Sequence, residues 1–280
     1  MSIHIKTNGV WKTVREPRVK DNEEWKDLKA VHIKHEGQWR MVWSRWAPID
    51  GRLVGIVSSG DFISGNALAS SIGLSAGTAH NSTCDWLHFE LEGQTIMIPQ
   101  LTLRYNLTWR DIYVRGAVYS DTTGHGPYPG GSGVNQNRYV TIGGTQYKVT
   151  LLKGANAENV VHNYGHLWED NHTDARNYDP SSTHQSEWNK LMYRLAQDGG
   201  HDLAPNPASH PYGIWEEWDN TQMGLTGNGG YSWCQEKGTR TGHTNDLRVR
   251  RGGRGVSSVF CTPVARSHSG PGWRPALRKM

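Results

Sequence analysis

The chain has 280 residues and a formal net charge of +4, from 30 basic and 26 acidic residues. That length suffices for one large domain, or for a small domain joined to a larger one, and the near-even charge balance differs from that of a dedicated nucleic-acid binder. Thirteen tryptophans, 33 glycines and 12 prolines against three phenylalanines predict a strand-rich, loop-rich protein and exclude a disordered chain.

Residues 1–46 contain three copies of a 14-residue unit. The copies start at Ile3, Pro17 and Val31, and each carries one tryptophan followed by a cationic residue. The tryptophans are Trp11, Trp25 and Trp39. Each unit has the pattern of a β-hairpin, because "IHIK" alternates apolar and polar residues, "TNG" or "HEG" supplies a turn, and "VWKTV" resumes the alternation. The middle unit has "DNEE" at its turn and is the weakest hairpin.

One such hairpin cannot bury its apolar face alone, and three form a ribbon that is thin without a partner surface. Two arrangements are open. The ribbon packs on the rest of the chain as a small sheet, or symmetry-related copies complete it. The second is favoured, so residues 1–46 are assigned to oligomerisation or docking, with the three tryptophans as structural residues.

Pro48 and the Asp50-Gly51 pair end the repeat. Residues 47–83 are rich in Gly, Ser and Ala, and we interpret them as a connector. The sequence leaves open whether this connector is flexible or forms a strand pair of small residues.

Residues 84–280 carry the denser pattern of a larger domain. Hairpins are predicted over 85–99, with Glu92-Gly93 at the turn, and over 137–154, with Gly143-Gly144 at the turn. Thr108 is the expected N-cap of a short helix. "QSEWNKLMYRLAQ" predicts an amphipathic helix from the spacing of its apolar residues, and three glycine-flanked strands follow. Mixed strands with two short helices indicate an α+β domain. The apolar residues of the predicted helix are Trp188, Leu191, Met192 and Leu195.

"NDLRVRRGGRGVSSVF", residues 245–260, predicts a half-buried strand that runs into a glycine bend. Its arginines are expected to pair with carboxylates or to cap loop carbonyls. A nucleic-acid role is the weaker interpretation, because no basic groove interleaved with aromatic residues accompanies the cluster. The structural residues predicted in the last third of the chain are Arg250, Arg251, Gly252, Gly253 and Trp273.

The order "SEWNKLMYRL", "YSWCQE", "RVRRGG", "GWRPAL" resembles the formylglycine-generating, sulfatase-modifying-factor family, whose fold is a variant of the C-type lectin fold. The combination with "WLHFELEGQTIMIP" looks like phage virion proteins that bear this domain at their C-terminus. "VKxxGxWKxV" units recur near the N-terminus of such proteins. The resemblance implies an α+β protein, a C-type-lectin-like domain over 84–280 preceded by the β-hairpin repeat.

The resemblance also implies a function and partners. The chain is expected to be a virion protein of a tail fibre, spike or baseplate that is assembled in the host cytoplasm. Its expected partners are other virion proteins and its own copies, with which it would form a homotrimer. Its lectin-like domain would bind a host-surface receptor or glycan. A purely architectural role, as a capsid decoration or baseplate joint, is the alternative. No nucleic acid and no membrane insertion are expected, since no apolar run reaches membrane length.

A further alternative function is that of a formylglycine-generating-type oxidase. The oxidase members of that family need a reactive cysteine pair near their C-terminus. Here Cys234 falls in a predicted strand, and no second cysteine follows Cys261. We therefore predict no catalytic residue and no enzymatic activity.

The resemblance places the ligand-facing end in the loops over 210–230, 236–246 and 265–272. Aromatic faces stack on sugar rings, and carboxylate or amide groups bond to hydroxyls. The alternative, given equal weight, is that Trp215 and Trp218 pack beneath the loops. The predicted ligand-binding residues are Tyr212, Trp215, Glu216, Trp218, Asp219 and Asn228.

Residues 161–180 gather histidines and carboxylates, including His162 and His166 at a spacing that suits zinc on a helix. The surrounding Asn and Gly residues favour a solvated loop instead. We predict no metal and no cofactor, with Ca²⁺ bound through carboxylate and carbonyl oxygens as the minor alternative.

Overall fold

The computed structural model describes fifteen stretches of the chain. They are residues 3–7, 10–14, 18–21, 24–27, 30–35, 38–44, 51–120, 131–155, 160–162, 186–192, 195, 218–240, 246–253, 255–256 and 258–280.

The N-terminal repeat forms three hairpins, as predicted. They are β1 (Ile3–Thr7) with β2 (Val10–Val14), β3 (Arg18–Asp21) with β4 (Glu24–Asp27), and β5 (Ala30–His35) with β6 (Gln38–Ser44). Each hairpin is a separate two-stranded antiparallel sheet among the described residues. The register is equivalent in all three, because the Lys that precedes each turn pairs with the Trp that follows it. These pairs are Lys6–Trp11, Lys20–Trp25 and Lys34–Trp39.

The rest of the described chain builds two sheets, and the first has six antiparallel strands in the order β12-β13-β19-β10-β9-β7. Its strands are β7 (Arg52–Val57), β9 (Trp86–Leu91), β10 (Gln94–Pro99), β12 (Tyr139–Ile142), β13 (Thr145–Thr150) and β19 (Ala276–Lys279). The two predicted hairpins are confirmed as β9–β10 and β12–β13. The turn residues Glu92 and Gly93 have φ of 51° and 78°, the left-handed conformation that such tight turns require.

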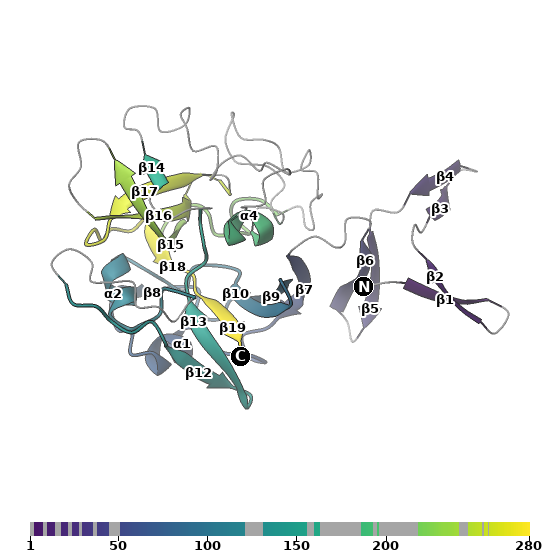
Figure 1. Ribbon diagram of the computed structural model, residues 1–280, viewed down its shortest axis with the longest axis horizontal. Coiled ribbons are helices and arrows are strands. Elements are labelled where there is room, and N and C mark those ends of the chain that lie inside the picture. Colours follow the sequence, from purple (N-terminus) through teal and green to yellow (C-terminus); the bar gives the residue numbers. More distant parts are fainter. Residues whose placement is uncertain are drawn as a thin grey trace.

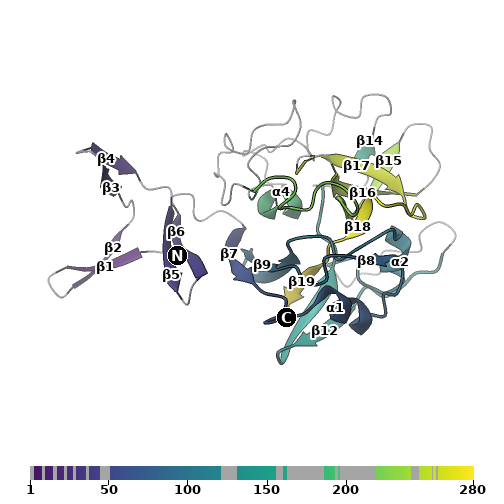
Figure 2. The same ribbon diagram turned by 180° about the vertical axis from the view of Figure 1, so that it is seen from behind.

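The second sheet has seven strands in the order β17-β16-β15-β18-β11-β8, with β14 also paired to β15. Its strands are β8 (Thr78–Ala79), β11 (Arg104–Tyr105), β14 (Val160–His162), β15 (Tyr231–Arg240), β16 (Leu247–Gly252), β17 (Val259–Pro263) and β18 (Pro271–Trp273). Figures 1 and 2 show the two sheets as separate halves of the larger domain, with the C-terminal chain passing from β18 in one to β19 in the other.

Three short helices lie in the described chain: α1 (Gly65–Ser71), α2 (Trp109–Tyr113) and α4 (Glu187–Leu191). Thr108 caps α2 as predicted, and its hydroxyl and the Asp111 carboxylate satisfy each other's backbone N–H groups. Ser186 caps α4. All four apolar residues predicted to define that helix are fully buried, although the described helix ends at Leu191. The domain therefore mixes strands with few helices.

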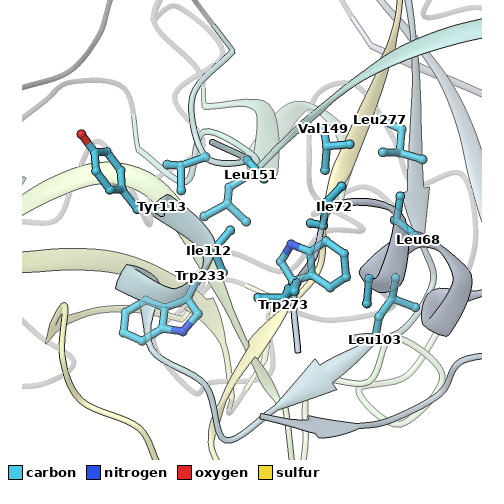
Figure 3. Close-up of a cluster of buried hydrophobic side chains, with 14 of the residues drawn as sticks. Leu68, Ile72, Leu103, Ile112, Tyr113, Val149, Leu151, Trp233, Trp273 and Leu277 are labelled. Carbon is cyan, nitrogen blue, oxygen red and sulfur yellow. The ribbon is translucent and has the colours of Figure 1, made fainter. Parts of the chain in front are cut away.

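The main core lies between the two sheets. Figure 3 shows Trp233 and Trp273 of the second sheet in one cluster with Val149 and Leu277 of the first, together with side chains of α1 and α2. A second core covers the opposite face of the six-stranded sheet, where Leu87, Phe89 and Ile96 pack with Trp188 and its neighbours on α4. Because successive strand residues point to opposite faces, β9 contributes to both cores.

The segment predicted as a connector, residues 47–83, joins this packing from residue 51 onward. Strand β7 pairs with β9, and Leu68 and Ile72 of α1 belong to the main core. The packed unit therefore begins about thirty residues before the predicted boundary at Cys84. The composition was misleading because small residues allow close packing: a Cβ on Gly65 would lie 2.9 Å from a Leu103 methyl carbon.

The prediction of a half-buried strand in the arginine-rich stretch is wrong. Leu247, Arg248, Val249 and Arg251 of β16 are all at most 2% exposed, so both faces of the strand are covered. The reason is that other elements cover each face: Leu247 and Val249 pack with Ala155 and Cys234 on one face, and Arg248 lies on the other. Arg248 is accommodated by an ion pair with Asp246 and by the ring of Trp109, 4.2 Å from its guanidinium carbon.

Candidate functional site

Arg250 and Arg251 are neighbours on β16 but point to opposite faces of the sheet, and their surroundings differ. Arg251 is fully buried and donates hydrogen bonds of 2.8 Å to the carbonyl of Gly154 and to Asn189 Oδ1. It thus acts as the sequence predicted, by capping loop and helix oxygens. Arg250 is half-buried and has no such oxygen partner among the described residues.

Two aromatic rings hold the Arg250 guanidinium instead. Its central carbon lies 3.9 Å from the centre of the Tyr231 ring and 5.3 Å from that of Phe260. The two rings meet edge to face, with centroids 5.1 Å apart. Both positions follow from strand pairing, because Arg250 stands opposite Phe260 on β17 and Tyr231 begins β15. A cation over an aromatic face is attracted by about 0.5–2 kcal/mol, which fixes the guanidinium plane.

The glycine bend after Arg251 makes room for the Tyr231 ring. Gly252 and Gly253 have φ of 90° and 87°, and a Cβ on Gly253 would overlap that ring. These values lie in the region that favours glycine. The two glycines meet different neighbours: Gly253 makes room for the aromatic ring on which Arg250 stacks, and Gly252 lies against the backbone of Gly230.

His268 completes the cluster from the loop between β17 and β18. Its Nε2 lies 3.4 Å from Arg250 Nη1, and its Nδ1 accepts a 3.1 Å hydrogen bond from the backbone N–H of Gly270. A neutral imidazole that accepts at Nδ1 carries its proton at Nε2. In that tautomer, Nε2 of His268 and Nη1 of Arg250 are both N–H donors, so they do not hydrogen-bond to each other.

The charged groups of this cluster are Arg250 and the nearby Arg266. Burial lowers the pKa of Arg250 to about 10; Tyr231 and Cys261 oppose this shift, and Arg266 adds a smaller lowering contribution. Burial also lowers the pKa of His268, with contributions from Arg250 and Arg266, so the imidazole is neutral at pH 7. No carboxylate contributes to either shift in the described chain. We call Tyr231, Arg250, Phe260 and His268 the Arg250 cluster.

The predicted ligand-binding residues do not lie together in the described structure. Tyr212, Trp215 and Glu216 lie outside the described residues. Trp218 is half-buried against the second core, and its backbone N–H donates to the Leu195 carbonyl at 3.0 Å. Asp219 is exposed and closes a turn with Gln222. This packing of Trp218 is the alternative role that the sequence left open.

Asn228 is the predicted ligand residue that lies near the Arg250 cluster. It is exposed in the turn before β15, and that turn is tied to the His268 loop by the bond from Gly229 N–H to the Ser269 carbonyl, 2.7 Å long. The remaining structural residue, Trp273, is fully buried in the main core. Sequence reasoning named the loop over 265–272 but missed His268 and Tyr231, because only strand order brings them to Arg250.

The candidate metal residues fall mostly outside the described chain, where only the backbone of His162 is placed, in β14. Within the described residues no group of three or more His, Cys, Asp or Glu side chains could hold a metal ion. No helix there is long and apolar enough to cross a membrane.

Comparison of the chain with family models, with curated proteins and with solved structures finds no match.

The cysteines differ in access, and this gives a testable expectation. Cys234 and Cys261 are buried, and burial raises the pKa of Cys234 well above its usual value. Cys84 is only partly buried. Because the thiolate is the reactive form, we expect a thiol reagent to modify Cys84 first in the native full-length protein, and all three cysteines after unfolding in denaturant. Mass spectrometry of tryptic peptides identifies the modified residue. Rapid native modification of both Cys234 and Cys261 would contradict this and would favour the oxidase alternative.

Proposed function

We propose that this chain is a structural protein of a phage virion, in a tail fibre, spike or baseplate. Its hairpin repeat assembles it, and a C-type-lectin-like domain contacts the host surface. The observation that carries the proposal is the repeat. Three hairpins with equivalent register each remain a two-stranded sheet among the described residues. An isolated two-stranded hairpin is at best marginally stable in water, so a partner surface would complete each one.

The charge distribution supports docking by the repeat. Ten of the 30 basic residues and six of the 26 acidic ones lie in residues 1–46, which therefore account for the whole net charge of +4. The rest of the chain holds 20 of each sign. A basic ribbon with a tryptophan in each unit suits a partner surface that is both apolar and acidic. Such a surface is expected on another virion protein, or between copies in a homotrimer where acidic residues of one chain meet basic residues of the next.

Removal of residues 1–46 is expected to abolish self-association and docking while the larger domain stays folded. The packed unit starts at residue 51, so a chain beginning at Ala47 keeps both large sheets intact. Light scattering should give an oligomer mass for the full chain and a monomer mass for the shortened one, with similar melting midpoints. An unchanged mass would refute assembly through the repeat.

An adsorption experiment distinguishes the proposed receptor-binding role from the architectural alternative, a capsid decoration or baseplate joint without a receptor. A receptor-binding domain, isolated as residues 47–280, should compete with intact particles for host cells. If the domain binds no host cell while the full chain still assembles, the architectural role is favoured.

A further inference from the structure

The unmatched donors of the Arg250 cluster indicate an anionic ligand. Arg250 Nη1 and His268 Nε2 lie 3.4 Å apart, and neither group has a carboxylate partner in the part of the chain that is described. A single oxyanion within reach of both nitrogens would accept a hydrogen bond from each. Arginine presents its donors in a rigid planar fork that matches carboxylate, sulfate and phosphate oxygens.

The cluster is also held rigidly before any ligand arrives. The guanidinium plane is fixed by the Tyr231 ring at 3.9 Å and by Phe260, which is 7% exposed. His268 is fixed by the Gly270 N–H, and a Cβ on Gly270 would lie 2.8 Å from the imidazole. Rigid donors lose little entropy on binding. Arg250, His268 and Tyr231 are each partly exposed, so a ligand can reach them from solvent.

We propose that Arg250 and His268 bind a sulfate, phosphate or carboxylate group carried by an acidic surface polysaccharide. Tyr231 and Phe260 orient the guanidinium, and the exposed Arg266 adds positive potential. The identification of the ligand as part of a polysaccharide rests on the proposed function. The anion site itself rests on the geometry of the four side chains.

The test uses the full-length chain and three variants. Arg250→Gln removes the charge and keeps a polar side chain, and His268→Phe keeps a ring without donors. Lys237→Gln is the matched control, because Lys237 is an exposed cation on β15 of the same sheet. Melting midpoints are measured in sodium sulfate and in sodium chloride at equal ionic strength, since a ligand that binds the native state raises its stability.

We expect sulfate to raise the midpoint of the unmodified chain and of Lys237→Gln at millimolar concentrations. Arg250→Gln should need at least about tenfold more sulfate for the same rise, the loss typical of one charge-assisted bond. His268→Phe should show a smaller loss in the same direction, and it supplies the test if Arg250→Gln does not fold. Equal responses in all four proteins would overturn the site, because general salt stabilisation acts on any surface.

A second arm identifies the source of the anion. Dextran sulfate is expected to bind more tightly per sulfate group than inorganic sulfate, and uncharged dextran is expected not to bind. If inorganic sulfate binds as tightly as dextran sulfate per sulfate group, the ligand is a free oxyanion. That result would overturn the proposal that the anion belongs to a polysaccharide. Light scattering on the same samples reports assembly separately, so failure of the site is distinguishable from failure of the proposed virion role.

Discussion

Replacement of Arg251 by methionine is expected to lower the free energy of unfolding by about 3–5 kcal/mol. Methionine fills a similar volume but makes no hydrogen bonds to the Gly154 carbonyl or to Asn189 Oδ1. Both acceptors lie in a region where Arg251 itself is fully buried, and a buried acceptor without a donor costs about 1–3 kcal/mol. The same change also removes the hydrogen bond that joins β16 to Asn189 of α4.

The matched control is Arg250→Met on the adjacent residue. Arg250 makes ring contacts and no hydrogen bond to a carboxylate or carbonyl in the described chain, so we expect its replacement to change stability by no more than about 1 kcal/mol. Urea unfolding monitored by tryptophan fluorescence gives both values, and a constant slope confirms a two-state comparison. Equal losses for the two variants would contradict the division of the pair into one scaffold arginine and one accessible arginine.

Replacement of Gly252 by alanine is expected to cost about 3 kcal/mol. The backbone φ of 90° disfavours any residue with a Cβ, by about 1–2 kcal/mol. The added Cβ would also lie 2.6 Å from the carbonyl oxygen of Gly230. That oxygen belongs to the backbone just before β15, so relief requires a shift of the chain and adds about 1–3 kcal/mol.

Gly93→Ala isolates the conformational part of this cost. Gly93 has a φ of 78° in the exposed β9–β10 turn, and a Cβ there would meet nothing within 4 Å. We expect a loss of about 1 kcal/mol for this control, measured by the same urea titration. If both glycine variants lose the same amount, the close approach between Gly252 and Gly230 is not what makes glycine necessary.

The two predictions separate the roles within "RRGG". Arg251 and Gly252 are expected to hold the second sheet against α4 and the turn before β15, while Gly253 and Arg250 shape an accessible surface. A domain that recognises a ligand needs both, because a site holds its geometry only when the residues beneath it are rigidly packed. Changes to Arg250 should therefore alter anion binding with little effect on folding, and changes to Arg251 should act on folding first.

The sequence by itself determined the local features of this chain. The tryptophan spacing predicted three hairpins with equivalent register, and Glu92-Gly93 and Gly143-Gly144 marked the two turns that the structure contains. Thr108 marked the start of α2. These features depend on residues within a few positions of each other, where turn geometry, capping and alternation act without reference to the rest of the fold.

The tertiary structure alone decided which residues are covered and which meet. Neighbouring arginines have different roles because they point to opposite faces of β16. Arg251 meets the Gly154 carbonyl and Asn189 on one face, whereas Arg250 lies partly exposed against the Tyr231 ring on the other. Residues 51–83 joined the core although their composition suggested a connector. His268 reached Arg250 across 18 positions. Burial and contact of this kind depend on strand order and on the element that covers each face, which local patterns do not contain.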